Sequence, residues 1–142
     1  MRYNPIPQEW KSNINALRLL IEGDQTDHLR VNNLGWQYGG KTFNDAVNLL
    51  KDDMKKDLQG QGIDVAGCTV RHFYRGANIT PHDPTKRLLI IPINGVSTLS
   101  PPGPPSGELP LDTYCLIDDQ PTLSGRNIDV IFVAFDARKE NP

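Results

Sequence analysis

The chain has 142 residues, 37% of them hydrophobic, and its 15 basic and 17 acidic side chains leave a formal net charge of −2. This size and composition predict one globular domain over residues 1–142. The charge balance argues against duplex nucleic acid as a partner, because a protein that binds a duplex needs a basic face. No apolar stretch approaches the roughly 20 residues that cross a bilayer, so we expect no membrane partner.

The N-terminal residues and the cysteines favour a reducing compartment. The first ten residues, MRYNPIPQEW, lack the charged-then-apolar layout of a signal peptide, and we therefore expect a cytoplasmic protein. Cys68 and Cys115 show neither C-x-x-C pairing nor zinc-ligand spacing. Both are expected to be buried thiols.

The first expected element in chain order is a helix over residues 8–22. Four apolar residues fall on one helical stripe: Trp10, Ile14, Leu17 and Ile21. Pro7 suits the start of this helix, and Gly23 suits a left-handed residue at its end. Residues 28–37 then alternate loosely and are expected to form one short strand.

A second helix is expected to begin at Thr42, which forms a capping-box pattern with Asp45. It is expected to end at Gly60 or Gly62. Its apolar stripe has five members: Phe43, Val47, Leu50, Met54 and Leu58. The helical part of the domain therefore covers about residues 7–60.

The sheet part is expected over about residues 63–136, where the apolar period changes to two. Residues 68–75 form one strand, and residues 88–93 form the most apolar one. Asn94-Gly95 between residues 88–93 and 96–99 predicts a hairpin with a type I′ turn. Pro92 cannot donate to a strand ladder, which predicts an edge or a bulge there.

A proline-rich segment, residues 100–110 (SPPGPPSGELP), is expected to be an extended loop. It could also close a pocket as a lid or form an interface. Residues 114–117 and 126–135 are expected to be the last strands. Helices first and strands afterwards indicate an α+β fold, in which two N-terminal helices pack on one face of a mostly antiparallel sheet.

The sequence contains none of the catalytic or cofactor motifs sought: no HExxH, GxSxG, GxxxxGK[ST] or GxGxxG pattern. His82-Asp83 follows a proline and is interpreted as a solvated turn. We therefore expect no cofactor and no metal site, and we lean against an enzyme. The enzymatic hypothesis that stays open is a set of groups that converge only in the fold, around His72 and Asp129.

The strand over residues 70–75 carries the main functional hypothesis. Arg71 and Arg75 flank Phe73 on one strand face, so two guanidinium groups could grip an anion while the ring stacks on a base or sugar. Three further residues could help from nearby positions: Asn78, Arg87 and Arg126. The alternative is that these arginines are ordinary residues on a solvated sheet face.

Two functions follow from these patterns. The first is a non-enzymatic binding protein for a small anionic ligand such as a nucleotide. The alternative is a protein-interaction module, such as an inhibitor, adaptor or assembly subunit, which the proline-rich loop and an edge strand near Pro92 would serve. In either case we expect a homo-oligomer, because small sheets have unpaired edges. Trp36, between two turn signals, is expected to be buried. In size and layout the chain is similar to small accessory proteins of bacteria and their phages, a similarity that assigns no residue a role.

Overall fold

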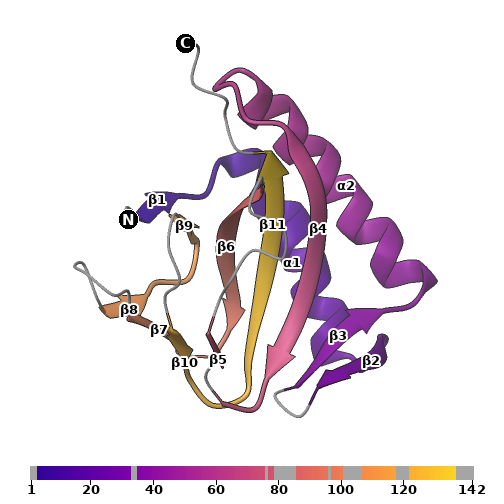
Figure 1. Ribbon diagram of the computed structural model, residues 1–142. Coiled ribbons are helices and arrows are strands. Elements are labelled where there is room, and N and C mark those ends of the chain that lie inside the picture. Colours follow the sequence, from indigo (N-terminus) through magenta and orange to yellow (C-terminus); the bar gives the residue numbers. More distant parts are fainter. Residues whose placement is uncertain are drawn as a thin grey trace.

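The computed structural model contains two helices and eleven strands within the residues that it describes (Figure 1). Those residues are 3–32, 35–75, 77–78, 86–95, 97–100, 107–117 and 122–136. The elements in chain order are β1 (Tyr3–Pro5), α1 (Gln8–Glu22), β2 (Asp27–Asn32), β3 (Gly35–Gly39), α2 (Lys41–Gln59), β4 (Val65–Phe73), β5 (Ala77–Asn78), β6 (Lys86–Asn94), β7 (Ser97–Ser100), β8 (Gly107–Leu109), β9 (Thr113–Ile117), β10 (Thr122–Ser124) and β11 (Ile128–Asp136).

The strands form two sheets. The large sheet has seven strands in the order β1-β9-β6-β11-β4-β3-β2, and the small sheet has four in the order β5-β10-β7-β8. Each pairing between described strands is antiparallel. From β4 onward the chain passes back and forth between the sheets, as in jelly-roll folds.

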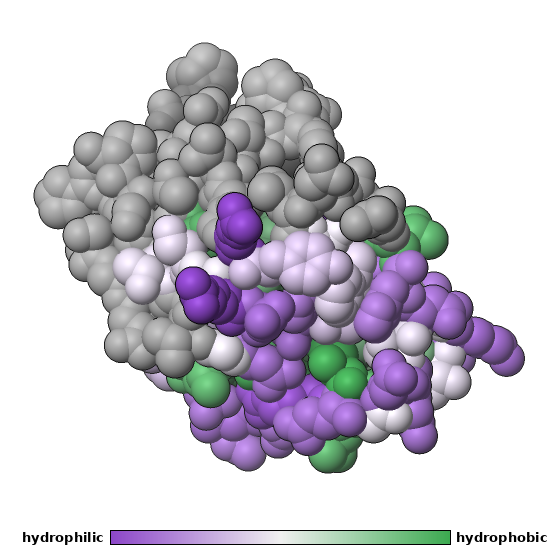
Figure 2. All heavy atoms as spheres, turned by 90° about the horizontal axis from the view of Figure 1, so that it is seen from below, coloured by the Kyte–Doolittle hydropathy of each residue, from purple (hydrophilic) through white to green (hydrophobic). Residues whose placement is uncertain are grey.

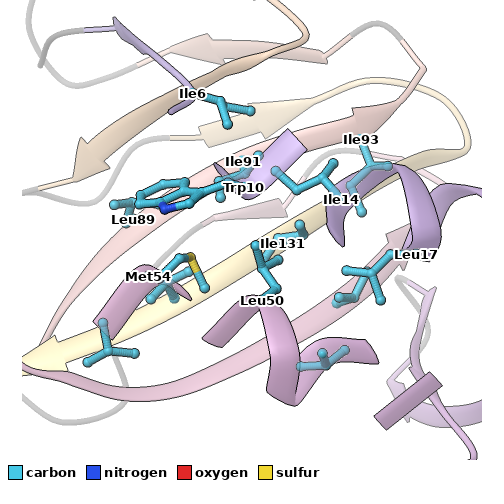
Figure 3. Packing of buried hydrophobic residues seen from close by; sticks show 14 of the residues in the cluster. Ile6, Trp10, Ile14, Leu17, Leu50, Met54, Leu89, Ile91, Ile93 and Ile131 are labelled. Carbon is cyan, nitrogen blue, oxygen red and sulfur yellow. The ribbon is translucent and has the colours of Figure 1, made fainter. Parts of the chain in front are cut away.

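One face of the large sheet shares a hydrophobic core with the helices, which we call the first core (Figure 3). It joins the apolar stripes of α1 and α2 to alternating residues of the strands, including Val70, Leu89, Ile91, Ile131 and Val133. Alternate residues of a strand point to the same face, so this set defines one side of β4, β6 and β11. Fully burying each such aliphatic side chain stabilises the fold by about 1.5–3 kcal/mol.

The opposite face of the large sheet carries a smaller second core. Its members are Phe73, Ile90, Cys115, Ile117, Leu123, Ile128 and Val130, with Leu88 and Phe132 packed against them. Leu123 belongs to β10 of the small sheet, so this core lies where the small sheet meets the large one. Both faces of β4 therefore contact packed side chains.

The α+β class is confirmed, and both helical stripes are correctly predicted. Helix α1 spans the expected residues and buries Trp10, Ile14 and Leu17. All five stripe residues of α2 are buried. Apolar periodicity was sufficient here because each helix has one long face turned toward a core.

Predictions about element ends were less accurate. Helix α2 begins at Lys41 after Gly40, without a side-chain cap, so the Thr42–Asp45 capping box is wrong. Gly23 has φ −82°, and the left-handed conformation falls on Asp24 instead. The segment expected as one strand is a hairpin of β2 and β3.

The predicted hairpin at Asn94-Gly95 is also wrong. Gly95 has φ +81°, whereas Asn94 is not among the residues with positive φ. Strand β6 pairs with β9 and β11 in the large sheet, while β7 belongs to the small sheet. The Asn-Gly pair therefore marks a passage between sheets. Pro92 lies in an interior strand, and the predicted bulge is present as a shift in the β6–β11 register beside it.

Most of the proline-rich segment, residues 101–106, lies outside the described residues, and β8 follows it. Within the described chain, neither helix combines the length and apolar composition of a membrane span.

Candidate functional site

The predicted outward strip of Arg71, Phe73 and Arg75 is not formed. Phe73 is only 6% exposed and packs edge-on against Phe132 in the second core, with ring centroids 5.9 Å apart. The sequence pattern had assigned this side of β4 to solvent, whereas Phe73 belongs to a core that includes Leu123 of the small sheet. Arg75 is exposed but follows the end of β4. The stacking role given to Phe73 is therefore wrong.

The three auxiliary residues lie in different places. Arg87 stands opposite Phe135 of β11, whereas Arg71 stands opposite Val130, five residues away along the same strand. At the usual rise per strand residue this separation is about 17 Å, so Arg87 is not gathered with Arg71. Its guanidinium lies 5.6 Å from the centre of the Phe135 ring.

The other two lie toward the end of the molecule where β4 stops and β11 starts. Arg126 is exposed just before β11. Asn78 lies in β5, where its backbone pairs with Thr122 of the small sheet. Figure 2 views this end of the molecule and shows mainly hydrophilic side chains on its described part, with small hydrophobic patches among them.

Arg71 itself occupies an unusual environment. Its register partners are Val130 on β11 and Gln37 on β3, and its guanidinium carbon lies 6.0 Å from the centre of the Phe132 ring. Its Nε atom is buried and has no hydrogen-bond partner. Burial lowers the pKa of the guanidinium. Within the described residues no carboxylate pairs with it, since the ion pair found there joins His72 and Asp129.

The surroundings of Arg71 are covered on one side and open on the other. Toward β11 lie Phe132 and the second core. Toward the sheet edge lies Gln37, and beyond it Leu29 of β2, which is 65% exposed. The planar fork of donors on arginine suits a carboxylate or phosphate, which can accept from two N–H groups at once.

The other face of β4, at the next residue, carries a fully paired polar cluster. The Asp129 carboxylate accepts hydrogen bonds from the Tyr38 hydroxyl (2.6 Å) and from Nδ2 of Asn94 (3.1 Å). It also lies 2.8 Å from Nδ1 of His72. Nε2 of His72 lies 3.2 Å from Oδ1 of Asn127. We call these five residues the Asp129 network.

Burial and the nearby carboxylate keep the hydroxyl of Tyr38 protonated. Desolvation, followed by the hydrogen bond and charge of Asp129, raises the pKa of Tyr38 far above its ordinary value. The nearby indole N–H of Trp36 lowers the pKa of Tyr38 and so offsets part of this rise, although it forms no hydrogen bond of normal geometry. Tyr38 is therefore a neutral hydrogen-bond donor at physiological pH.

Three rings stack beside the network. The indole of Trp36 lies between the imidazoles of His72 and His28, with centroid distances of 4.0 and 4.3 Å. Tyr38 and Tyr74 meet Trp36 edge-on. Trp36 is half-buried, less than the sequence predicted, and the ring of His28 that stacks on its outer face is itself exposed.

Gly35 makes this stack possible. A Cβ atom at Gly35 would lie 1.7 Å from the backbone oxygen of His72. Only a residue without a side chain allows β3 and β4 to approach so closely. The glycine therefore helps to place Trp36 against His72.

The hypothesis of groups around His72 and Asp129 described a real contact. The two residues are 57 positions apart and become direct register partners when β4 pairs with β11. Tyr38, Asn94 and Asn127 were missed, since nothing local in the sequence marks residues that meet only through strand register. Within the described part of the chain, no three His, Cys, Asp or Glu side chains are grouped to hold a metal ion. His82 and Asp83 lie outside that part.

Comparison with known proteins supplies the fold alone. No protein-family model matches the chain, and no curated protein matches it in sequence. Among solved structures, it is similar to a Pseudomonas putida prolyl-4-hydroxylase with a TM-score of 0.53 and 13% sequence identity, over 96% of this chain and 92% of that one. The similarity therefore concerns the fold and extends over nearly all of the chain.

Proposed function

We propose that this protein binds a small molecule carrying a carboxylate or phosphate group, and that Arg71 is the residue that holds this group. The observation that carries the proposal is the buried, unpartnered Nε of Arg71 on the second-core face. A nucleotide remains one member of this ligand class.

The energetics of Arg71 support a missing partner. A buried polar group without a hydrogen bond costs about 1–3 kcal/mol, and a charged one costs more. An oxyanion lying against Nε and one Nη would satisfy the orphaned donor and neutralise the charge in a single contact. Phe132 covers one side of the guanidinium, which favours an approach in the plane of the fork from the Gln37 side.

The mode of binding differs from the one that the sequence suggested. Phe73 is enclosed in the second core, so a base or sugar has no access to its ring. Arg75 lies beyond the strand end. The proposal therefore retains an anionic ligand, assigns its recognition to the guanidinium of Arg71 alone, and drops the stacking of a base or sugar on Phe73.

A ligand panel tests the proposal. Thermal shift and calorimetry would compare sulfate, phosphate, mono- and dicarboxylates, and mono-, di- and cyclic nucleotides. At least one class should bind, Arg71→Met should abolish that binding, and Arg71→Lys should weaken it because the charge remains without the fork. The matched control is Arg75→Met at an exposed position, which should bind normally. A flat response across the panel, or equal loss in both methionine variants, would contradict the proposal.

A second candidate is hydroxylation of a prolyl residue, the activity named for the structural neighbour. The observation that favours it is the fold match over nearly the full length of both chains. Folds host many activities, so this is an analogy and assigns no residue a role. Hydroxylation inserts one atom of dioxygen into a C–H bond while a two-electron donor reduces the other atom, and aerobic cells supply both reagents. Co-expression with a proline-rich peptide in such cells, followed by mass spectrometry, tests it. Addition of one oxygen atom on proline would support this activity, and unmodified peptide from well-folded protein would count against it.

A further inference from the structure

We propose that anion binding at Arg71 is coupled to protonation of the His72–Asp129 pair on the opposite face of the large sheet. The inference rests on the proposed function, because it concerns regulation of the same site. It predicts that the protein takes up protons when it binds an anion.

The geometry of β4 places the two sites back to back. Arg71 and His72 are consecutive, so their side chains leave opposite faces of the strand. On each neighbouring strand the partners are also consecutive: Val130 with Asp129 on β11, and Gln37 with Trp36 on β3. Each residue beside Arg71 is thus covalently joined to one beside His72.

Charge provides the coupling. When His72 is neutral, the Asp129 carboxylate is an uncompensated negative charge beneath Arg71, and it opposes a second anion there. When His72 is protonated, the pair is neutral overall. Each ring N–H then has an acceptor, the carboxylate on one side and the Asn127 oxygen on the other.

Among the described residues, few other groups facing the pair can change charge near neutral pH. Tyr38 on β3 is held neutral, and Tyr74 after β4 is a phenol. On α1, Arg18 donates to the carbonyl of Ile93, one residue before Asn94, and keeps its charge. The group that can compete is His28 on β2, across the Trp36 ring.

Histidine is the side chain whose ordinary titration falls between about pH 5 and 8. Protonation of His72 raises the potential at Arg71, so an anion should bind more tightly to the form of the protein in which the pair is protonated. For charges about 10 Å apart at an effective dielectric constant of about 20, the change in affinity reaches about ten-fold. By thermodynamic reciprocity, the anion favours the protonated pair by the same factor.

Proton uptake is measured by calorimetry, in which sulfate is titrated into the protein in two buffers of different ionisation enthalpy. Sulfate is a suitable probe because its own charge does not change between about pH 5 and 8, where histidine titrates. The wild-type protein should take up a fraction of a proton at the pH where its affinity for sulfate changes. Asp129→Asn should remove both the uptake and the pH dependence and should bind sulfate at least as tightly as the wild type at about pH 8. His28→Gln, which keeps the Asp129 network, should still take up protons.

The outcomes separate the two proposals. Sulfate binding that depends on Arg71 but releases or absorbs no proton would overturn the coupling alone. Uptake that disappears in His28→Gln and persists in Asp129→Asn would also overturn it, by assigning the proton elsewhere. No binding at any pH would instead remove the proposed function. If Asp129→Asn fails to fold, NMR of the three imidazoles in the wild-type protein replaces it. The variants His28→Gln and His82→Gln assign two sets of signals, which leaves the third to His72. Sulfate must then shift the His72 signals toward the protonated form.

Discussion

Arg71 and His72 are neighbours in β4, yet their polar groups lie in opposite circumstances. On the first-core face, the ring nitrogens of His72 and the Asp129 oxygens all meet hydrogen-bonding partners. On the second-core face, Arg71 has an aromatic ring on one side and an orphaned Nε. Both sites are at least half-buried, so burial alone does not explain the difference. A closed network stabilises the fold, whereas a buried donor without a partner, such as Nε of Arg71 or Nε1 of Trp36, needs an explanation; for Arg71 we propose a ligand.

The largest expected effect on stability comes from removing the shared acceptor of the Asp129 network. Asp129→Ala leaves the Tyr38 hydroxyl, His72 and Asn94 without their shared acceptor. Removing one partner of a buried, paired charge costs about 3–5 kcal/mol. Urea denaturation should show this loss in the free energy of unfolding. Asp52→Ala, at an exposed position of α2, is the control and should change stability by less than about 0.5 kcal/mol. A loss below 1 kcal/mol at Asp129 would mean that the network is not closed.

Tyr38→Phe removes one donor from the same network and should cost about 1.5–3 kcal/mol, because the acceptor is a carboxylate. The folded-state pKa of Tyr38 is raised, so its contribution is fully present below the unfolded pKa of about 10 and falls as pH rises above it. Urea midpoints for both proteins should therefore converge as the pH increases beyond 10. A difference that stays constant or widens would contradict the assigned cause.

How far the sequence predicted this arrangement depends on the kind of signal. The stripes of α1 and α2 follow from apolar periodicity, which is local and survives packing. Strand positions were also approximately right. Nothing in the sequence indicates that β4 has packed residues on both faces, because alternation predicts two faces without saying what covers them. That single omission turned Phe73 from a core residue into a proposed stacking platform.

The Asp129 network was beyond local patterns for a different reason. Four of its members come from β3, β4, β6 and β11, which strand pairing brings together, and the fifth, Asn127, directly precedes β11. The same holds for Asn94-Gly95, whose local hairpin signal was overridden because β6 and β7 join different sheets. Arg71 lies on the strand face that alternation predicts, away from the helices, and its role as a binding residue stays a prediction.

A substitution at Arg71 should change stability in the opposite sense to one in the Asp129 network. Arg71→Met replaces an unpartnered guanidinium by an apolar chain of similar length. Without a ligand, we expect unchanged stability or a gain of about 1 kcal/mol, since replacing a buried charge by a packed apolar group is often neutral or stabilising. Chemical denaturation in an anion-poor buffer measures this. A loss above 1 kcal/mol would show that Arg71 supports the fold and would weaken the contrast between the two faces.

The smallest expected effect concerns chemical reactivity and uses the cysteines as reporters of the two faces. Cys68 packs against the first core, and Cys115 lies in the second. Burial raises the pKa of the Cys68 thiol to about 12, with Lys51 opposing it. Because the thiolate is the reactive form, alkylation of native Cys68 should be slow at pH 8 and should rise about ten-fold per pH unit up to the pH at which the protein unfolds. Mass spectrometry distinguishes the two modified cysteines. A Cys68 rate that levels off near pH 9, as for a free thiol, would mean that this part of the first-core face is open to solvent.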